Sequence, residues 1–549
     1  MPFLKNEAAQ TLIAEIDRLE RQSDTCRDGL DLLRKPWNLA GWVSLAECMR
    51  RIESELPKNV YGGIDHRIVV MNVSRAAAQL CRWCLETADS RPVPRSRFRW
   101  SVAAGRDANR AFEVAYQYEH FCSTFPAWHH FVYAADVVGD NRIRFSSQAN
   151  LGERRVSAHQ KGILPPEARK KPESTDRTVA LDSLVQLILQ ESRSNGVLGF
   201  RPTRRQQMFE MLFGMYEKRL DALFRRFPQF DIGGYNLADF RRFYAALLSI
   251  TGTQDYLCFV WAGNHSYPLD SSVIVKSKVE WTDLVSQICG IDKNVVSLII
   301  SDLVFDRSTS HDLHVQPFVP LDRDQKLLAI APPFVLSSNW EENILRTCSY
   351  VRPRLYSETT RTKENEMRDL IKAKVAFPML AHGPYRLLKH LPDVDLVVED
   401  SRSNSILFAE LKWLRKPQIV QERIQQDKEL LKGVRQAKTI RAFLDANGDF
   451  LPTRHRVTKP LSQYSHIYHC VIARDHLLYH DPQDLPIFEF EAFVQALQSA
   501  NDLESAVEQM IKLDWLPVEE RDFKVEFIPS IAAGVTIELE TYFPQYRLG

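Results

Sequence analysis

The stretch LPDVDLVVEDSRSNSILFAELKW, residues 391–413, decides the fold of the C-terminal part of this chain. It contains two strongly apolar runs, 394–398 and 405–411, which are typical of buried strands. Each run also carries carboxylates, which a sheet core normally excludes because an unpaired buried charge is costly. Lys412 lies two positions after Glu410, so alternation along a strand places both side chains on one face. A divalent metal ion and a polar substrate are the usual reason for such a combination.

The two runs fit an antiparallel hairpin whose turn falls on residues 401–404, SRSN, a sequence with suitable turn chemistry. In that register Asp395 lies opposite Glu410, and both carboxylates share a face with Lys412. Two carboxylates at this separation can bind one Mg²⁺ or Mn²⁺ ion, together with the carbonyl of Leu411 and water. The metal ion would lower the pKa of a bound water and neutralise charge on a phosphate. Lys412 would orient that water or stabilise the developing negative charge.

The elements on both sides of this hairpin form a larger pattern. Residues 363–498 are predicted to form a helix, two strands, a helix, a strand, a short strand and a helix. This order, with the acids and the lysine at these places, resembles the PD-(D/E)xK nuclease superfamily over roughly residues 360–500. The resemblance implies a restriction-endonuclease-like core, with Asp395 and Glu410 as metal ligands and Lys412 as the residue that positions the nucleophile.

In that family the leading helix often supplies another acid, with apolar residues three and seven positions later. Glu364 fits this pattern, since Met367 and Ile371 stand at those positions. Glu366 is the rival, but Asp369 stands three positions after it. The resemblance implies that the helix acid would hold a second metal ion or a water, and both glutamates remain candidates for it.

The family often has a glutamine on the helix after the lysine strand, and Gln436 matches it. Many relatives carry an aromatic residue four positions later, where this chain has Ile440. The literal Pro-Asp pair of the family is present at 392–393. Asp395 is nevertheless the preferred ligand, because it immediately precedes an apolar run and fits the register. Asp393 would share its strand face as a second acid.

Glu-x-Lys occurs once in the chain, at 410–412. Asp-x-Lys also occurs at 324–326 and 522–524, in or beside charged turns and without an upstream strand acid. The competing interpretation of the 395, 410 and 412 side chains is an edge hairpin with a surface salt bridge. The apolar flanks of both strands favour a core location instead.

The long polar helix predicted at 421–446 lies near the proposed site. Its cations Lys432 and Arg435 are candidate contacts to phosphate groups. Gln436 would orient the site or touch the nucleic-acid backbone.

The composition bounds the class of protein. At 549 residues the chain is expected to form about two to four domains, and 44% hydrophobic and 26% charged residues are typical of a soluble globular protein. The net charge of +1 excludes a global basic bias, so a nucleic-acid surface would be a local patch. No run approaches a membrane span, and the N-terminus has no signal-peptide pattern. Nine scattered cysteines predict reduced thiols and a cytoplasmic location.

The predicted fold class is α+β and multidomain, with a mostly helical N-terminal region followed by a mixed α/β core that resembles restriction endonucleases. Residues 160–178 are rich in proline and charge and are expected to form a linker or exposed loop. The predicted parts are a helix-rich region at 1–160, a second helix-rich region with short strands at its end at 175–345, the nuclease-like core at 350–510 and a C-terminal extension with strands at 511–549.

Two further motifs have less support. Cys81 and Cys84 would share a helix face as half of a zinc site, but no second CxxC exists in the sequence, so packing in a helical core is favoured. His311 and His314 could ligate a metal ion, but nothing nearby in the sequence completes a site, so a polar loop is favoured.

The sequence therefore predicts an Mg²⁺- or Mn²⁺-dependent endonuclease. DNA is favoured over RNA as the substrate, and the helical N-terminal region is expected to bind a protein partner or form a homo-oligomer. Similar nucleases joined to helical parts occur in prokaryotic restriction and anti-phage defence, which is an analogy from the resemblance. The alternative is a non-catalytic nucleic-acid-binding or protein-assembly module on a nuclease-like scaffold. A third interpretation places an enzyme's chemistry in the N-terminal half, for example at Cys81 and Cys84.

Overall fold

The computed structural model describes most of the chain. The described residues are 7–61, 66–87, 92–129, 133–139, 142–147, 154–155, 186, 190, 202–223, 231–262, 267–308, 311–375, 379–415, 417, 420–447, 457–474, 485–513, 515–532 and 535–545. The predicted linker at 160–178 lies outside them.

The chain divides into two compact units. The first unit consists of Met1–Cys122, Glu173–Ser357 and Ile531–Val535. The second unit consists of Ser123–Pro172, Glu358–Ser530 and Thr536–Gly549. Most of both predicted helix-rich regions therefore belong to the first unit, and most of the predicted nuclease-like range belongs to the second.

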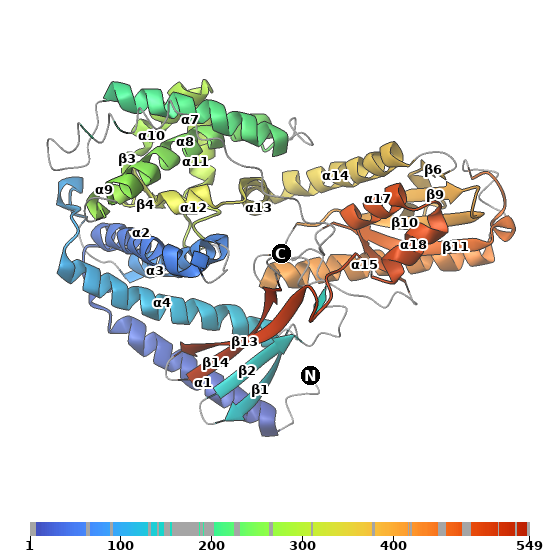
Figure 1. Cartoon of the computed structure of the whole chain (residues 1–549), viewed down its shortest axis with the longest axis horizontal. Helices are drawn as coiled ribbons and strands as arrows, with labels where there is room; N and C mark the ends of the chain where they lie inside the picture. The colour runs from blue at the N-terminus through green and yellow to red at the C-terminus, as the bar shows by residue number, and fades with distance from the viewer. Residues whose placement is uncertain are drawn as a thin grey trace. The chain divides into compact units, whose positions relative to one another are not determined.

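The first unit is mainly helical because its sequence repeats apolar residues at helical spacing (Figure 1). Its helices are α1 (Glu7–Asp28), α2 (Trp37–Tyr61), α3 (His66–Thr87), α4 (Val102–His129, which crosses the boundary), α7 (Pro202–Leu223), α8 (Leu237–Ala262), α9 (Leu269–Ser272), α10 (Lys278–Cys289), α11 (Lys293–Asp302), α12 (Pro332–Leu336) and α13 (Trp340–Val351). A small antiparallel sheet has the order β3 (Ile274–Ser277), β5 (Leu327–Ile330) and β4 (Val319–Pro320). The core of this unit buries Trp42, Trp83 and Phe112 from α2, α3 and α4.

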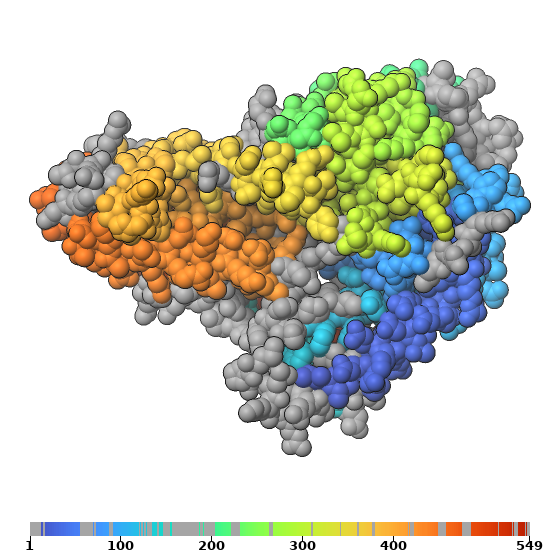
Figure 2. All heavy atoms as spheres, turned by 180° about the vertical axis from the view of Figure 1, so that it is seen from behind, coloured from blue at the N-terminus to red at the C-terminus, as the bar shows by residue number. Residues whose placement is uncertain are grey.

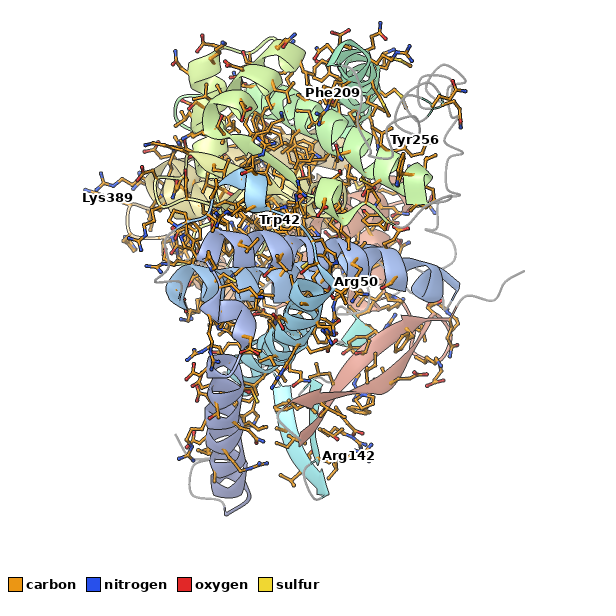
Figure 3. All side chains as sticks on the ribbon, turned by 90° about the vertical axis from the view of Figure 1, so that its left-hand side faces the viewer. Trp42, Arg50, Arg142, Phe209, Tyr256 and Lys389 are labelled. Atoms are coloured by element: carbon orange, nitrogen blue, oxygen red, sulfur yellow. The ribbon has the colours of Figure 1, made fainter. Side chains whose placement is uncertain are left out.

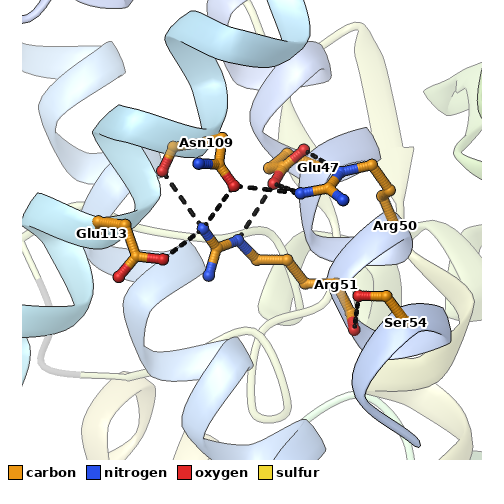
Figure 4. Close-up of polar contacts among 6 residues, drawn as sticks. All are labelled: Glu47, Arg50, Arg51, Ser54, Asn109 and Glu113. Atoms are coloured by element: carbon orange, nitrogen blue, oxygen red, sulfur yellow. Dashed lines mark hydrogen bonds and ion pairs between the residues drawn. The ribbon is translucent and has the colours of Figure 1, made fainter. Parts of the chain in front are cut away.

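A buried polar network joins α2 to α4 within the first unit (Figure 4). Glu47 is fully buried and accepts hydrogen bonds from Arg50 Nη2 at 2.6 Å and from Arg51 Nε at 3.1 Å. Arg51 Nη2 also donates to Asn109 and Glu113 of α4, at 2.7 Å and 2.6 Å. Because the buried carboxylate is paired with two arginines, and Arg51 also reaches α4, the cluster links the two helices without leaving a buried charge unpaired.

The second unit is built on a five-stranded mixed sheet with the order β12–β11–β10–β9–β6. These strands are β6 (Met379–His382), β9 (Leu396–Asp400), β10 (Ser405–Lys412), β11 (His466–Ala473) and β12 (Ile487–Glu489). The central strand β10 pairs antiparallel with β9 and parallel with β11. A short hairpin of β7 (Tyr385–Arg386) and β8 (Asp393–Val394) precedes β9.

The helices that accompany this sheet are α14 (Pro353–Lys374), α15 (Val420–Ala446), α17 (Phe490–Ser499) and α18 (Leu503–Ile511). The sheet face that carries Val397, Phe408 and Val471 is covered by α15, which buries Val434 and Ile440 there. Figure 2 shows the gold surface of α14 adjoining the orange surface of the strands and α15. The unit boundary after Ser357 lies inside α14.

The turn between β9 and β10 occupies residues 401–404, as predicted. Asp400 accepts hydrogen bonds from the Arg402 N–H at 2.9 Å and from the Ser403 hydroxyl at 2.8 Å. Asn404 has a φ of 55°, which asparagine tolerates better than most residues. These local contacts set the length of the connection and therefore the register of the hairpin.

A separate four-stranded sheet in the second unit joins segments that are far apart in the sequence. Its order is β1 (Tyr133–Gly139), β2 (Arg142–Ser147), β14 (Val535–Pro544) and β13 (Phe523–Ala532). Arg142, labelled in Figure 3, and Arg144 both form ion pairs across it with Glu538. Strands in the C-terminal extension were expected, and β13 and β14 confirm them.

The predicted α+β class is confirmed. The predicted element order over 363–498 is also found, but β6, β7 and β8 add short strands around the expected hairpin. Among the described residues no single helix is long and apolar enough to cross a membrane, although α10 and α11, bent by 120°, pass that test as a pair by length and composition.

Candidate functional site

The β9–β10 hairpin brings Asp395, Glu410 and Lys412 together. The backbone N–H of Leu411 donates to Asp395 Oδ2 at 2.9 Å, which ties the acid that precedes β9 to the neighbouring strand. Lys412 Nζ donates to Glu410 Oε1 at 2.6 Å. The antiparallel pairing of β9 and β10 ends at Leu396 and Ala409. Continued by one position, this register sets Asp395 opposite Glu410. The predicted register is therefore confirmed.

The cluster is buried within the sheet and is not displayed on its edge. Glu410 exposes 4% of its surface, and the Lys412 side chain exposes 13%. The strand that carries both residues lies between β9 and β11. The competing interpretation, a surface salt bridge on an edge hairpin, is therefore wrong.

Burial and like charges change how protons are held in this cluster. Burial, together with the nearby Asp395 carboxyl, raises the pKa of Glu410. Burial also raises the pKa of Asp395, although the Leu411 N–H and Lys412 oppose this. Burial alone would lower the pKa of Lys412, but the surrounding carboxylates outweigh it and raise that pKa. The cluster thus holds more carboxylates than its one lysine neutralises, a condition that favours the binding of an added cation.

Helix α14 places a third carboxylate close to this cluster. The charge of Glu364 acts on both Glu410 and Lys412 and raises the pKa of each. Its apolar companions Met367 and Ile371 are buried, as the pattern predicted. Residues three and seven positions apart share a helix face, so the face of α14 that packs into the core also presents Glu364 to the site.

Glu366 has different surroundings. Burial raises its pKa to about 7, and the charges that act on it come from Lys363 and Asp369 rather than from the strand cluster. Between the two predicted helix acids, the charges that act on each therefore favour Glu364.

Two further residues of α14 contact the site and were not predicted. Arg368, one turn after Glu364, donates through Nη1 to the Asp395 carbonyl at 3.4 Å, and its charge acts on the Asp395 carboxyl. Lys372, one turn further, donates to the Gly383 carbonyl at 2.9 Å. Charged residues spaced four apart lie on one helix face, and this spacing is the sequence signal that could have revealed them.

The segment before β7 passes very close to Asp395. Gly383 has a φ of 117°, and a Cβ at this position would lie 2.9 Å from the Asp395 carbonyl oxygen. Any side chain at this position would strain the backbone and collide with the main-chain carbonyl of Asp395, so glycine is required.

Helix α15 lies against the lysine. A Cβ at Gly433 would be 3.1 Å from Lys412 Cε, so the missing side chain leaves room for the lysine stem. Gln436 follows about one turn along this helix, and its Oε1 is buried with no hydrogen-bond partner among the residues that the structure describes. Gln436 therefore offers a carboxamide oxygen that can accept a hydrogen bond, and it lies on α15, the helix that covers the cluster.

The two predicted phosphate-contact cations lie on the solvent side of α15. Lys432 exposes 59% of its side chain and forms an ion pair with Glu429 at 3.7 Å. Arg435 is also exposed. Both side chains face solvent, where a ligand could reach them.

The donors of the cluster fit a hard divalent cation such as Mg²⁺ or Mn²⁺. Glu410 Oε2 is buried and has no hydrogen-bond partner within the described residues. The Leu411 N–H points to Asp395. In an extended strand the carbonyl of a residue points to the same side as its N–H, so the Leu411 carbonyl also lies on the side of Asp395. No three His, Cys, Asp or Glu side chains form a ready metal site in the described part of the chain, so carbonyl, water and substrate oxygens would complete the coordination.

A second polar cluster lies on the same sheet face, two alternations along β9 from Asp395. The ring of His382 joins the Tyr385 hydroxyl, at 2.6 Å from Nδ1, to Glu399 Oε1, at 2.6 Å from Nε2. Glu399 also accepts hydrogen bonds from Thr458 and Tyr464. Burial alone would raise the pKa of Glu399, but the hydrogen bonds that it accepts lower it to about 2.

The remaining sequence candidates lie in packed surroundings. Cys81 and Cys84 are buried in the core of the first unit, and burial raises the pKa of Cys84 to about 12, so the predicted packing role is confirmed. His311 and His314 are nearly buried, and His314 Nε2 lies 3.0 Å from Ser337 Oγ.

The chain matches no protein-family model, no curated protein and no solved structure. The resemblance to PD-(D/E)xK nucleases therefore stays a prediction. The arrangement of the Asp395, Glu410 and Lys412 side chains is the basis on which a function can be assigned.

Proposed function

We propose that the second unit hydrolyses phosphodiester bonds in nucleic acid with a divalent metal ion, as PD-(D/E)xK nucleases do. One observation carries this proposal. Lys412 donates a hydrogen bond to Oε1 of Glu410. The other carboxylate oxygen, Oε2, is buried and has no hydrogen-bond partner among the described residues. A buried carboxylate oxygen without a partner is costly, and a bound cation would remove that cost.

Asp395 and Glu410 are the residues that would hold the metal ion, with the carbonyl of Leu411 beside them. When bound, Mg²⁺ or Mn²⁺ supplies Lewis-acid polarisation of a phosphate oxygen and lowers the pKa of a coordinated water. Lys412, fixed by Glu410 at 2.6 Å, would orient the attacking water and stabilise negative charge on the phosphate. The water oxygen bonds to phosphorus as the bond to the leaving sugar oxygen breaks in line. The proton lost by the water and the proton gained by the sugar oxygen are exchanged with solvent.

The proposed substrate is DNA rather than RNA. A role in prokaryotic restriction or anti-phage defence is proposed by analogy with other nucleases of this kind that are joined to helical regions. The first unit would then recognise a substrate, a trigger or a protein partner.

The test is cleavage of plasmid, single-stranded DNA and RNA by the full chain with Mg²⁺ or Mn²⁺ and with a chelator. We expect Asp395→Asn and Lys412→Met each to lower cleavage by about 100-fold or more, because each removes a group that acts at the reacting phosphate. Lys326→Met is the matched control, since Asp324 and Lys326 have the same spacing but form an exposed pair.

Circular dichroism and the melting temperature show whether each variant keeps its fold. Equal metal-dependent cutting by the wild type and both site variants would exclude this site. Binding of nucleic acid without any cleavage would instead support the non-catalytic alternative.

A further inference from the structure

The β7–β8 hairpin lies directly beside the proposed metal ligands. It spans residues 385–394, with Tyr385 paired to Val394 and Arg386 paired to Asp393. It ends one residue before Asp395. Whatever binds along this hairpin is therefore next to the acids of the site.

The hairpin is fixed to the sheet by its apolar residues. Leu387 and Val394 are 3% and 1% exposed and belong to the same core cluster as Val397 and Phe408. Leu391 packs against that cluster as well. Arg386 lies between Tyr385 and Leu387, which both pack on the cluster, and Lys389 and His390 lie in the turn between the anchored Leu387 and Leu391, where all three side chains are exposed.

The base of the hairpin is fixed by polar contacts. The Tyr385 hydroxyl lies 2.6 Å from His382 Nδ1, and Glu399 holds the other ring nitrogen at 2.6 Å. Glu399 is in turn fixed by the Thr458 hydroxyl at 2.6 Å. A buried carboxylate with this many donors stays ionised and keeps the imidazole in one orientation.

The outer side of the hairpin carries two cations, Arg386 and Lys389, that form no ion pair with any residue that the structure describes. Both side chains are exposed, as is that of the neighbouring His390, and none of the three forms a hydrogen bond with another described residue. Figure 3 shows Lys389 pointing away from the ribbon into solvent. Asp393 stands opposite Arg386 in the register, but the two do not form an ion pair within the described residues.

We propose that the β7–β8 hairpin binds the sugar–phosphate backbone of the nucleic acid that enters the site, with Arg386 and Lys389 as the phosphate contacts. This deepens the proposed nuclease function and rests on it. Unpaired cations on a rigid scaffold gain the most from a polyanion, because no internal salt bridge is broken and little side-chain support must be reorganised. Contacts of this kind fix the position of the strand and do not read its sequence.

The test is binding of fluorescently labelled duplex DNA and RNA of arbitrary sequence to the full chain in a chelator, at salt concentrations of about 50 to 200 mM. For Arg386→Ala/Lys389→Ala we expect the slope of log affinity against log salt to become less steep by about 2, and affinity at low salt to fall roughly 10-fold. The exchange Arg386→Lys/Lys389→Arg, which keeps both charges, should restore the slope. Lys512→Ala/Lys524→Ala removes the same charge from other exposed positions of the second unit and should leave the slope unchanged.

An unchanged slope in Arg386→Ala/Lys389→Ala overturns the proposal, as does a wild-type chain that binds neither nucleic acid. Cleavage is measured separately with Mg²⁺ or Mn²⁺. Cleavage by the wild type with an unchanged slope in the hairpin variant means that only the hairpin assignment fails. A reduced slope without any cleavage means that the hairpin binds nucleic acid and the nuclease function fails.

Discussion

The side chain of Glu410 combines two opposing demands. Its carboxylate is almost completely buried, next to Asp395 and with one oxygen on Lys412. Burial favours the protonated form, whereas a metal site needs the ionised form. If the cluster binds a metal ion as proposed, the burial of Glu410 favours the bound state at the expense of the stability of the free protein.

This opposition predicts a pH-dependent gain in stability for Glu410→Gln. Because burial raises the pKa of Glu410, the folded chain keeps a proton that the unfolded chain has already released above its own, lower pKa. Stability of the wild type then falls as pH rises from the unfolded to the folded pKa, by up to about 1.4 kcal/mol per pH unit. The variant lacks this loss, so its advantage in melting temperature should grow between about pH 5 and 7 without metal.

Glu399→Gln is the control with the opposite sign. The hydrogen bonds that Glu399 accepts lower its pKa to about 2. The contribution of Glu399 to the free energy of unfolding is therefore fully present above the ordinary glutamate pKa, and it is lost as the pH falls toward the lowered value. This variant should melt below the wild type at neutral pH. A Glu410→Gln variant that is equally destabilised at every pH would contradict the argument.

Glu364 and Glu366 of α14 allow a predicted site residue to be compared with a near neighbour whose charge does not act on the strand cluster. Glu364→Gln should lower metal-dependent cleavage roughly 10- to 100-fold, whereas Glu366→Gln should leave it within about twofold. The reason is that only Glu364 acts on the strand cluster, while Glu366 interacts with Lys363. Rates measured at saturating metal ion compare the two, and an equal loss in both would assign the effect to the helix as a whole.

At the scale of elements, the candidate site combines the β9–β10 hairpin, which supplies Asp395, Glu410 and Lys412, with two helices, α14 and α15. Gly433 is where α15 approaches the strand, because its missing side chain makes room for Lys412. Helix propensity would favour alanine at this position, so the glycine is kept at a cost to the helix. The packing of α15 and the position of the lysine are therefore linked.

Gly433→Ala tests this link. Alanine should favour the helix by up to about 1 kcal/mol, but its Cβ must displace the Lys412 stem, so the net change in stability should be small. Cleavage should fall about 10-fold or more, since a displaced lysine no longer meets the water. Thermal melts and cleavage rates measure the two effects, and full activity in this variant would contradict the close contact. Gly214→Ala is the matched control, because no atom lies within 4 Å of a Cβ there.

The hairpin and its register were predictable from sequence because strong alternation and a good turn act locally around residues 401–404. The short strands at 379–386 were not predictable, since Gly383 and Pro384 interrupt the segment, and its two halves pair with different strands, β6 with β9 and β7 with β8. Arg368 was also missed, because its role depends on where a helix that is distant in sequence lies against Asp395. Residues that act through tertiary contacts leave only weak periodicity in the chain.

At the scale of the whole molecule, two cores share one chain. The second unit is assembled from three separate stretches, and its four-stranded sheet joins β2 to β14. Each unit buries its own apolar residues, as Cys81 in one and Cys470 in the other illustrate. Unfolding is therefore expected to deviate from a two-state transition.

Thiol labelling in rising urea measures this. Cys81 and Cys84 report on the first unit and Cys470 on the second, and all three are buried. We expect different labelling midpoints for the two units. Mg²⁺ or Mn²⁺ should raise only the Cys470 midpoint, because a ligand stabilises the fold that binds it.

Mass spectrometry of alkylated peptides follows each thiol separately. Asp395→Asn is the control that should abolish the effect of the metal ion. One common midpoint for all three thiols would show that the units unfold together.

The connection at residues 401–404 has a consequence for how sequences related to this one can vary. Whether Glu410 and Lys412 face α15 or the opposite side of the sheet depends on the parity of that loop. Inserting or deleting a single residue would move every side chain of β10 to the opposite face of the sheet. Glu410 and Lys412 would then no longer lie beside Asp395 and α15. Substitutions that keep the Ser403 contact with Asp400 and the positive φ at Asn404 should be tolerated, whereas a change of length by one residue should not, in contrast to the usual freedom of surface loops.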